Sequence, residues 1–156
     1  MAITLEDEAA EAMRRVLRGY AERHMVKDLD EAGEAVDFAL PGAGRLRLVC
    51  DPAKRSLTLR GLLPDVPAKS LLAEELAGLM AKCRAVETPE HRRVDPALAS
   101  LALRRAGRGL SLVLALREAD WEWGVRRMIN LAHAVRVMVH ADHPFFAQTH
   151  WGASEE

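Results

Sequence analysis

The order of the hydrophobic patterns is the feature that most constrains what this chain can fold into. An amphipathic helical pattern comes first, three short alternating segments follow, and a second helical pattern precedes two more alternating segments and a third helical one. The order α-β-β-β-α-β-β-α predicts an α+β domain of two layers. Five antiparallel strands need a cover for their shared apolar face, and three helices can supply it from one side.

The spacing of apolar residues sets the expected boundaries. Apolar positions three or four residues apart predict helices over 5–25, 68–84 and 120–143, with Pro67 suited to the first turn of the second helix. Residues 28–33 and 86–95 have a polar composition that predicts linkers. Alternating apolar and polar positions predict strands over 35–40, 45–51, 55–61, 97–104 and 110–117.

Size and composition favour one soluble domain. The 156 residues predict a single domain over 1–152 and a frayed tail over 153–156. The formal net charge of −1 gives no support to nucleic-acid binding. The sequence has neither a signal-peptide pattern nor an apolar run of about 18 residues, so we expect a cytoplasmic protein without a membrane partner. Abundant Ala, Leu and Arg indicate a bacterial source.

Catalytic and cofactor signatures are missing from the sequence. Cys50 and Cys83 lie on apolar faces and predict reduced, buried thiols rather than nucleophiles. The glycine pairs at 42–44 and 107–109 fall in expected hairpin turns rather than before helices, which argues against a phosphate-binding loop. We therefore expect no cofactor and no enzymatic activity.

A group of histidines near the carboxyl end is the one candidate metal site. His140, Asp142, His143 and His150 could supply imidazole and carboxylate ligands to a divalent ion such as zinc, and His140 and His143 share one helical face. The alternative is a helix that ends in cationic side chains, which the helix dipole favours. The second interpretation is preferred, because neither an HExxH nor a CxxC pattern accompanies the histidines.

Arginines gather around the fourth expected strand and its turn. They could dock an acidic partner or a phosphate, or they could guard an edge strand against aggregation. The guard is favoured, although Arg104 and Arg105 are also candidates for the polar rim of a binding surface. The set comprises Arg92, Arg93, Arg104, Arg105 and Arg108.

Large aromatic residues are concentrated in the last third of the chain. Trp123 lies off the apolar stripe of the third helix, where it could stack on Arg127 four residues later. If Trp123, Phe146 and Trp151 share one surface, with Phe145 beside them, that patch would mark an interface. The equally weighted alternative is a tail that folds back over the end of the sheet.

One family resemblance follows from the last helix and its tail. The run Met128-Ile-Asn-Leu-Ala-His-Ala-Val135, followed by Pro144-Phe-Phe146 and Trp151-Gly152, resembles the ending of the type III secretion chaperone-like fold, including its YbjN-like group. The order of elements is similar to that fold over most of the chain. The resemblance implies a non-enzymatic homodimer that binds a polypeptide or partner protein.

The expected function is therefore protein binding. The first hypothesis is a chaperone-like or regulatory module that forms a homodimer, with Trp123, Phe145, Phe146 and Trp151 as apolar anchors and Arg104 and Arg105 at the rim. The second is a metal-binding protein or metal-dependent enzyme that uses the histidine group.

Overall fold

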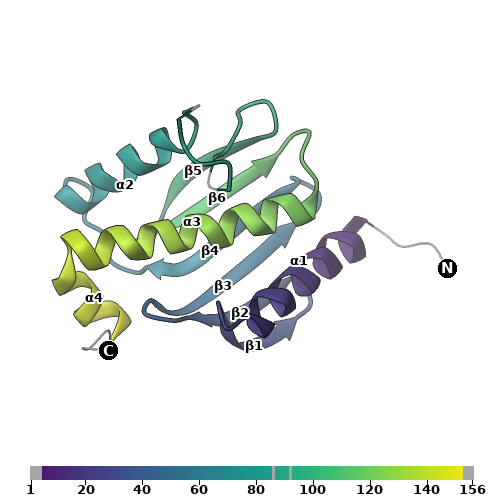
Figure 1. Cartoon of the computed structure of the whole chain (residues 1–156), viewed down its shortest axis with the longest axis horizontal. Helices are drawn as coiled ribbons and strands as arrows, with labels where there is room; N and C mark the ends of the chain where they lie inside the picture. Colours follow the sequence, from purple (N-terminus) through teal and green to yellow (C-terminus); the bar gives the residue numbers. More distant parts are fainter. Residues whose placement is uncertain (1–4, 86, 92, 153–156) are drawn as a thin grey trace.

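The structure is a computed structural model that describes residues 5–85, 87–91 and 93–152, with side chains from residue 8 onward. It has four helices and six strands in the described residues (Figure 1). The helices are α1 (Leu5–Glu22), α2 (Leu71–Lys82), α3 (Trp121–Asp142) and α4 (Pro144–Trp151). The strands are β1 (Lys27–Ala32), β2 (Ala35–Leu40), β3 (Gly44–Asp51), β4 (Ser56–Leu63), β5 (Ala99–Ala106) and β6 (Gly109–Leu116).

All six strands form one antiparallel sheet in the order β1-β2-β3-β4-β6-β5. Four strands follow one another as a meander. The chain then crosses through α2 and returns as the β5–β6 hairpin, whose second strand pairs with β4. The edges of the sheet are therefore β1 and β5.

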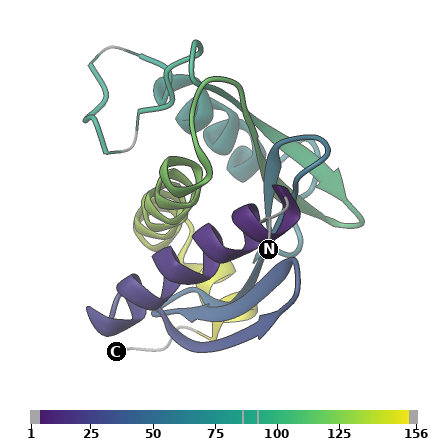
Figure 2. The ribbon, with the colours of Figure 1, turned by 90° about the vertical axis from the view of Figure 1, so that its right-hand side faces the viewer.

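The helices α1, α2 and α3 lie on one face of this sheet, as the two perpendicular views show (Figure 1, Figure 2). The buried core lies between the layers. Leu48, Leu57 and Leu114 from three adjacent strands are all fully buried beneath the helices. Both cysteines are buried there too, and burial raises the pKa of the Cys50 thiol. The expected two-layer α+β arrangement is confirmed.

The long helix α3 approaches the sheet closely because of Gly124. A Cβ at this position would come within 2.9 Å of methyl groups of both Leu57 and Leu116. The Asp120 side chain caps the helix by accepting a hydrogen bond from the Trp123 N–H at 2.8 Å. The helix ends before Pro144, as predicted.

Two elements were not predicted. The expected linker at 28–33 is most of strand β1, which pairs with β2. Apolar and polar residues do not alternate along β1, because it is an exposed edge strand whose side chains are mostly charged and mostly in solvent. The expected aromatic tail is helix α4, with Pro144 in its first turn and Gly152 in the left-handed conformation at its end. The prediction of five strands and three helices was wrong by one of each.

The start of α2 also differs from the prediction. The helix begins at Leu71, and the Ser70 hydroxyl caps it by accepting a hydrogen bond from the Ala73 N–H at 3.1 Å. Pro67 therefore lies in the turn before the cap rather than in the helix. A serine cap stabilises a helix start by about 1 kcal/mol, which sets the boundary here.

Candidate protein-binding surface

Two adjoining depressions lie on the helical side of the molecule, and Leu79 of α2 belongs to both. They have volumes of about 460 and 410 Å³. We call them together the α2–α3 groove. The larger is lined by Met25, Leu79, His91, Asn130, His133, Ala134, Val137 and Met138. The smaller is lined by Leu79, Lys82, Cys83, Ala85, Glu87, Thr88 and Pro89.

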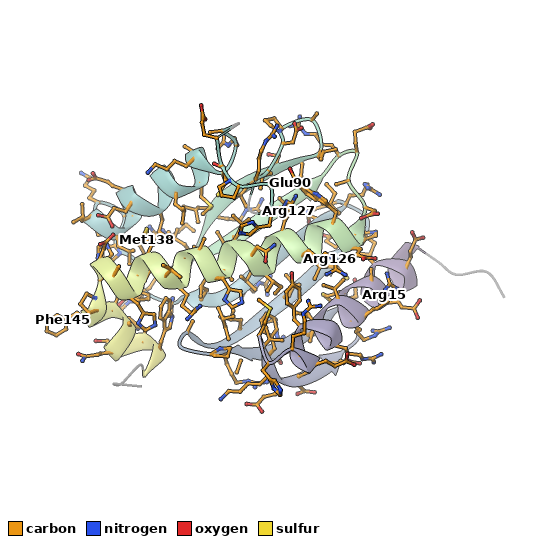
Figure 3. The ribbon with its side chains drawn as sticks, in the orientation of Figure 1. Arg15, Glu90, Arg126, Arg127, Met138 and Phe145 are labelled. Atoms are coloured by element: carbon orange, nitrogen blue, oxygen red, sulfur yellow. The ribbon has the colours of Figure 1, made fainter. Side chains whose placement is uncertain are left out.

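Arg127 of α3 fastens one wall of this groove. Its guanidinium donates hydrogen bonds to the Arg93 carbonyl at 2.8 Å and the His91 carbonyl at 3.2 Å, and to the Glu90 carboxylate at 2.9 Å. Glu90 and Arg127 lie side by side above α3 (Figure 3). Arg127 is only 8% exposed, and this burial lowers its pKa, while Glu90 opposes the shift. Arg127 thereby holds the segment between α2 and β5 against α3.

Trp123 contacts the Arg127 guanidinium as well. The Arg127 guanidinium lies 4.7 Å from the centre of the Trp123 ring, so the predicted stacking between these two residues is confirmed. The tryptophan is half-buried at the first turn of α3. The structure does not bring it together with the aromatic residues of α4, because the 22-residue helix α3, about 33 Å long, separates them.

His133 of α3 is one of the residues that line the larger depression of the groove. Its Nδ1 accepts a hydrogen bond from Arg136 at 3.4 Å, and its buried Nε2 has no partner among the described residues. Burial, and secondarily the positive charge of Arg136, lower the pKa of His133. The imidazole is therefore neutral at physiological pH and adds no charge to the larger depression.

Exposed apolar side chains of α2, α3 and α4 lie near the carboxyl end of α3, beside the groove. Leu71, Val137 and Phe145 are 63%, 60% and 83% exposed, and they are the large hydrophobic residues that stand out in solvent within the described part of the chain. His143 donates a hydrogen bond to the Glu75 carboxylate at 2.7 Å, which joins α2 to the start of α4. Phe145 points away from the body of the molecule, at the same end as Met138 (Figure 3).

Of the three predicted anchors on α4, only Phe145 is free. Trp151 is buried, and its indole N–H donates a hydrogen bond to the Leu62 carbonyl at 2.9 Å. Phe146 packs edge-on against Trp151, with ring centres 5.5 Å apart, and against the His150 ring at 4.6 Å. Helix α4 thus folds back and covers an end of the sheet, which was the alternative interpretation of these aromatic residues.

The two rim arginines have different environments. Arg105 donates hydrogen bonds to the carbonyls of Val66 and Arg108, so it ties the turn before α2 to the β5–β6 hairpin. Arg104 is exposed on β5, and within the described residues it makes no hydrogen bond or ion pair. Of the other predicted basic residues, Arg93 lies 3.7 Å from Asp95, and Arg92 is outside the described residues.

The candidate metal ligands are each directed elsewhere. His140 Nε2 donates a hydrogen bond to the Gly42 carbonyl at 2.6 Å, His143 binds Glu75, and His150 packs on Phe146. Asp142 is exposed at the end of α3. No group of three or more metal-ligating side chains is close enough to hold an ion among the residues that the structure describes. The structure does not bring these four residues together.

Sequence reasoning missed Leu71, Val137 and the clamping role of Arg127. Leu71 and Val137 each lie one or two positions away from the apolar stripe of their own helix. A large apolar residue off its stripe was the available signal, because such a residue cannot reach the core. No sequence pattern indicates that Arg127 binds carbonyls of a segment 34 to 36 residues earlier.

Comparison with protein-family models, with curated proteins and with solved structures finds no match for this chain. None of the described helices combines the length and the apolar character needed to cross a bilayer.

Proposed function

We propose that this chain is a non-enzymatic protein-binding module, chaperone-like or regulatory in kind, that acts as a homodimer. The observation that carries the proposal is the apolar surface formed by the α2–α3 groove together with Leu71, Val137 and Phe145. A monomeric protein seldom exposes large apolar side chains together, since each loses about 1.5–3 kcal/mol by staying in water instead of becoming buried.

The occupant that this surface fits is a second copy of the chain. A projecting ring, Phe145, and an open apolar groove occur on the same molecule, at the same end of α3. In a two-fold arrangement each copy can place its Phe145 in the groove of the other, so one surface supplies both halves of the contact. The neutral imidazole of His133 adds no charge that would oppose burial of the ring.

The test is sedimentation equilibrium on Phe145→Asp. The position is exposed and lies in the first turn of α4, where an acidic side chain is compatible with the helix, so we expect the monomer fold to persist. Loss of one buried ring at each of two symmetric contacts should raise the dimer dissociation constant by at least about 100-fold.

The matched control is Ala53→Asp. Ala53 is also exposed, but it lies in the turn between β3 and β4, whereas α4 contacts the opposite end of β3 near Gly44. This control should leave the dissociation constant unchanged. Equal association of the wild type and Phe145→Asp, with both folded by circular dichroism, would remove this surface from the dimer.

A further inference from the structure

The open face of the sheet, opposite the helices, carries exposed charged side chains. Side chains alternate along each strand, so the residues between the buried leucines of β4, β5 and β6 face outward. Arg60 of β4 and Arg104 of β5 are both exposed there. Ser111 of β6 pairs with Arg104, and it precedes Leu112, whose partner Leu59 precedes Arg60. The β4–β6 register is irregular between Leu59 and Leu63, so Ser111 lies on the strand between the two arginines without being a direct register partner of Arg60.

Hydrogen bonds divide the arginines near this face into two classes. Arg45 binds the Asp28 carbonyl at 3.2 Å, Arg47 binds the Asp37 carboxylate with both arms at 2.7 and 2.9 Å, and Arg105 binds two carbonyls. These three guanidiniums therefore already have hydrogen-bond partners within the protein. Arg60 and Arg104, in contrast, make no hydrogen bond or ion pair within the described residues.

Arg60 is also opposed by a like charge. It pairs directly with Arg47 across β3 and β4, and facing like charges destabilise a sheet. Arg47 turns toward Asp37, on the side away from β4, so Asp37 does not neutralise Arg60. An anion bound between Arg60 and Arg104 would relieve this repulsion and satisfy both guanidiniums.

The side chains next to these arginines on the open face are short. Thr58, Val113 and Ala102 occupy adjacent register positions on β4, β6 and β5, one row along from the arginines. Side chains of this size leave room for a polypeptide backbone to lie on the sheet while its carboxylates reach the longer arginines. Two strand spacings, about 10 Å, separate the Cα atoms of Arg60 and Arg104.

We propose that this half of the open sheet face binds a short acidic polypeptide segment, with Arg60 and Arg104 each receiving one carboxylate. Alternate residues of an extended segment place two carboxylates on one side about 6.6 Å apart, within reach of two arginine side chains. The inference deepens the proposed function and rests on it in one respect, namely that the partner is a polypeptide.

Three observations favour such a segment over a nucleic acid. The aromatic rings of the described strands are limited to Phe38, which is buried beneath the helices, so bases would find no ring to stack on. The chain has a net charge of −1. The β2–β3 half of the same face carries Asp37 and Asp51 beside Arg45 and Arg47, so it adds no net positive charge that would hold a longer polyanion.

The experiment measures fluorescence anisotropy of a labelled octapeptide of Ala, Ser and Gly with two glutamates two positions apart. Wild-type protein should bind it at least about tenfold more tightly than the same peptide with glutamines, and less tightly as salt is added. Arg60→Gln/Arg104→Gln should lose that preference. Arg84→Gln, which removes one exposed charge next to α2, should keep it.

Other outcomes overturn the inference. Equal binding of the glutamate and glutamine peptides, or an unchanged affinity in the double variant, removes the arginine pair as a binding site. Tighter binding of a single-stranded oligonucleotide through the same two arginines replaces the polypeptide with a nucleic acid. Sedimentation of the double variant separates this site from the dimer surface, because Arg60 and Arg104 lie on the other face and the variant should associate as the wild type does.

Discussion

Replacing Arg127 with methionine tests the account of how the α2–α3 groove is shaped. Methionine keeps most of the apolar volume of the arginine stem but removes every polar contact. The substitution should lower the free energy of unfolding and should loosen the segment between α2 and β5. The two effects have one cause, since the Arg127 side chain binds three groups of that segment, on Glu90, His91 and Arg93.

The contacts set the expected magnitude. The bond to the Arg93 carbonyl joins a charged donor to a half-buried acceptor, which is worth about 1.5–3 kcal/mol. The stack on Trp123 adds about 0.5–1 kcal/mol. The pair with Glu90 adds at most about 1 kcal/mol, because the Glu90 side chain is 82% exposed. Asn130 still donates to the His91 carbonyl at 2.8 Å, so that group keeps a partner.

Removing a buried charge also returns part of its desolvation cost, so the net loss should be about 2–3 kcal/mol. Urea denaturation measures this loss, and hydrogen–deuterium exchange measures opening of residues 87–91. Glu90→Gln is the control and should cost less than about 1 kcal/mol. A loss below about 0.5 kcal/mol for Arg127→Met, with unchanged exchange at 87–91, would refute the clamp.

Three further predictions concern single positions. Because the Arg47 guanidinium lowers the pKa of Asp37, this pair should contribute stability above the ordinary carboxyl pKa and lose it as pH falls through the lowered pKa; NMR titration should show a shift that Arg47→Met abolishes. Burial lowers the pKa of His133, so the unfolded chain takes up a proton first as pH falls below about 6.5, and stability should decline there less steeply in His133→Gln; identical pH profiles would contradict this. Gly124→Ala should cost about 1–3 kcal/mol in thermal or urea unfolding, because its methyl group would collide with leucine methyls at 2.9 Å, whereas Gly19→Ala, which meets nothing within 4 Å, should not destabilise the protein.

Periodicity predicted the elements that bury an apolar face and missed those that do not. β6 alternates Leu110, Leu112, Leu114 and Leu116, and the strand was placed within one residue of its true bounds. β1 has only Leu29 half-buried, so its place in the sheet depends on backbone pairing with β2, which side chains do not report. Helix α4 was missed for a related reason, since its eight residues cover the sheet end through Trp151 rather than through a repeated stripe.

The candidate site was less predictable than the fold. Aromatic content indicated the correct end of the chain, but it could not distinguish Trp151, whose indole N–H binds a buried carbonyl, from Phe145, which lacks a polar atom and projects into solvent. Which ring is buried depends on the direction in which α4 leaves α3, and the φ angle of −138° at His143 sets that direction. The spacing of residues in the sequence does not predict this backbone angle.

Hydroxyl-radical footprinting of the wild-type chain across a dilution series tests the proposed binding surface most directly. Phe145 is exposed and Met138 lines the groove, and both side chain types react readily with the radical. The account predicts that both become protected together as concentration rises and the mass reaches twice 17.3 kDa, while Arg60 and Arg104 on the other face keep their reactivity. Reactivity of Phe145 and Met138 that stays constant while the protein dimerises would place the dimer contact elsewhere and contradict the account.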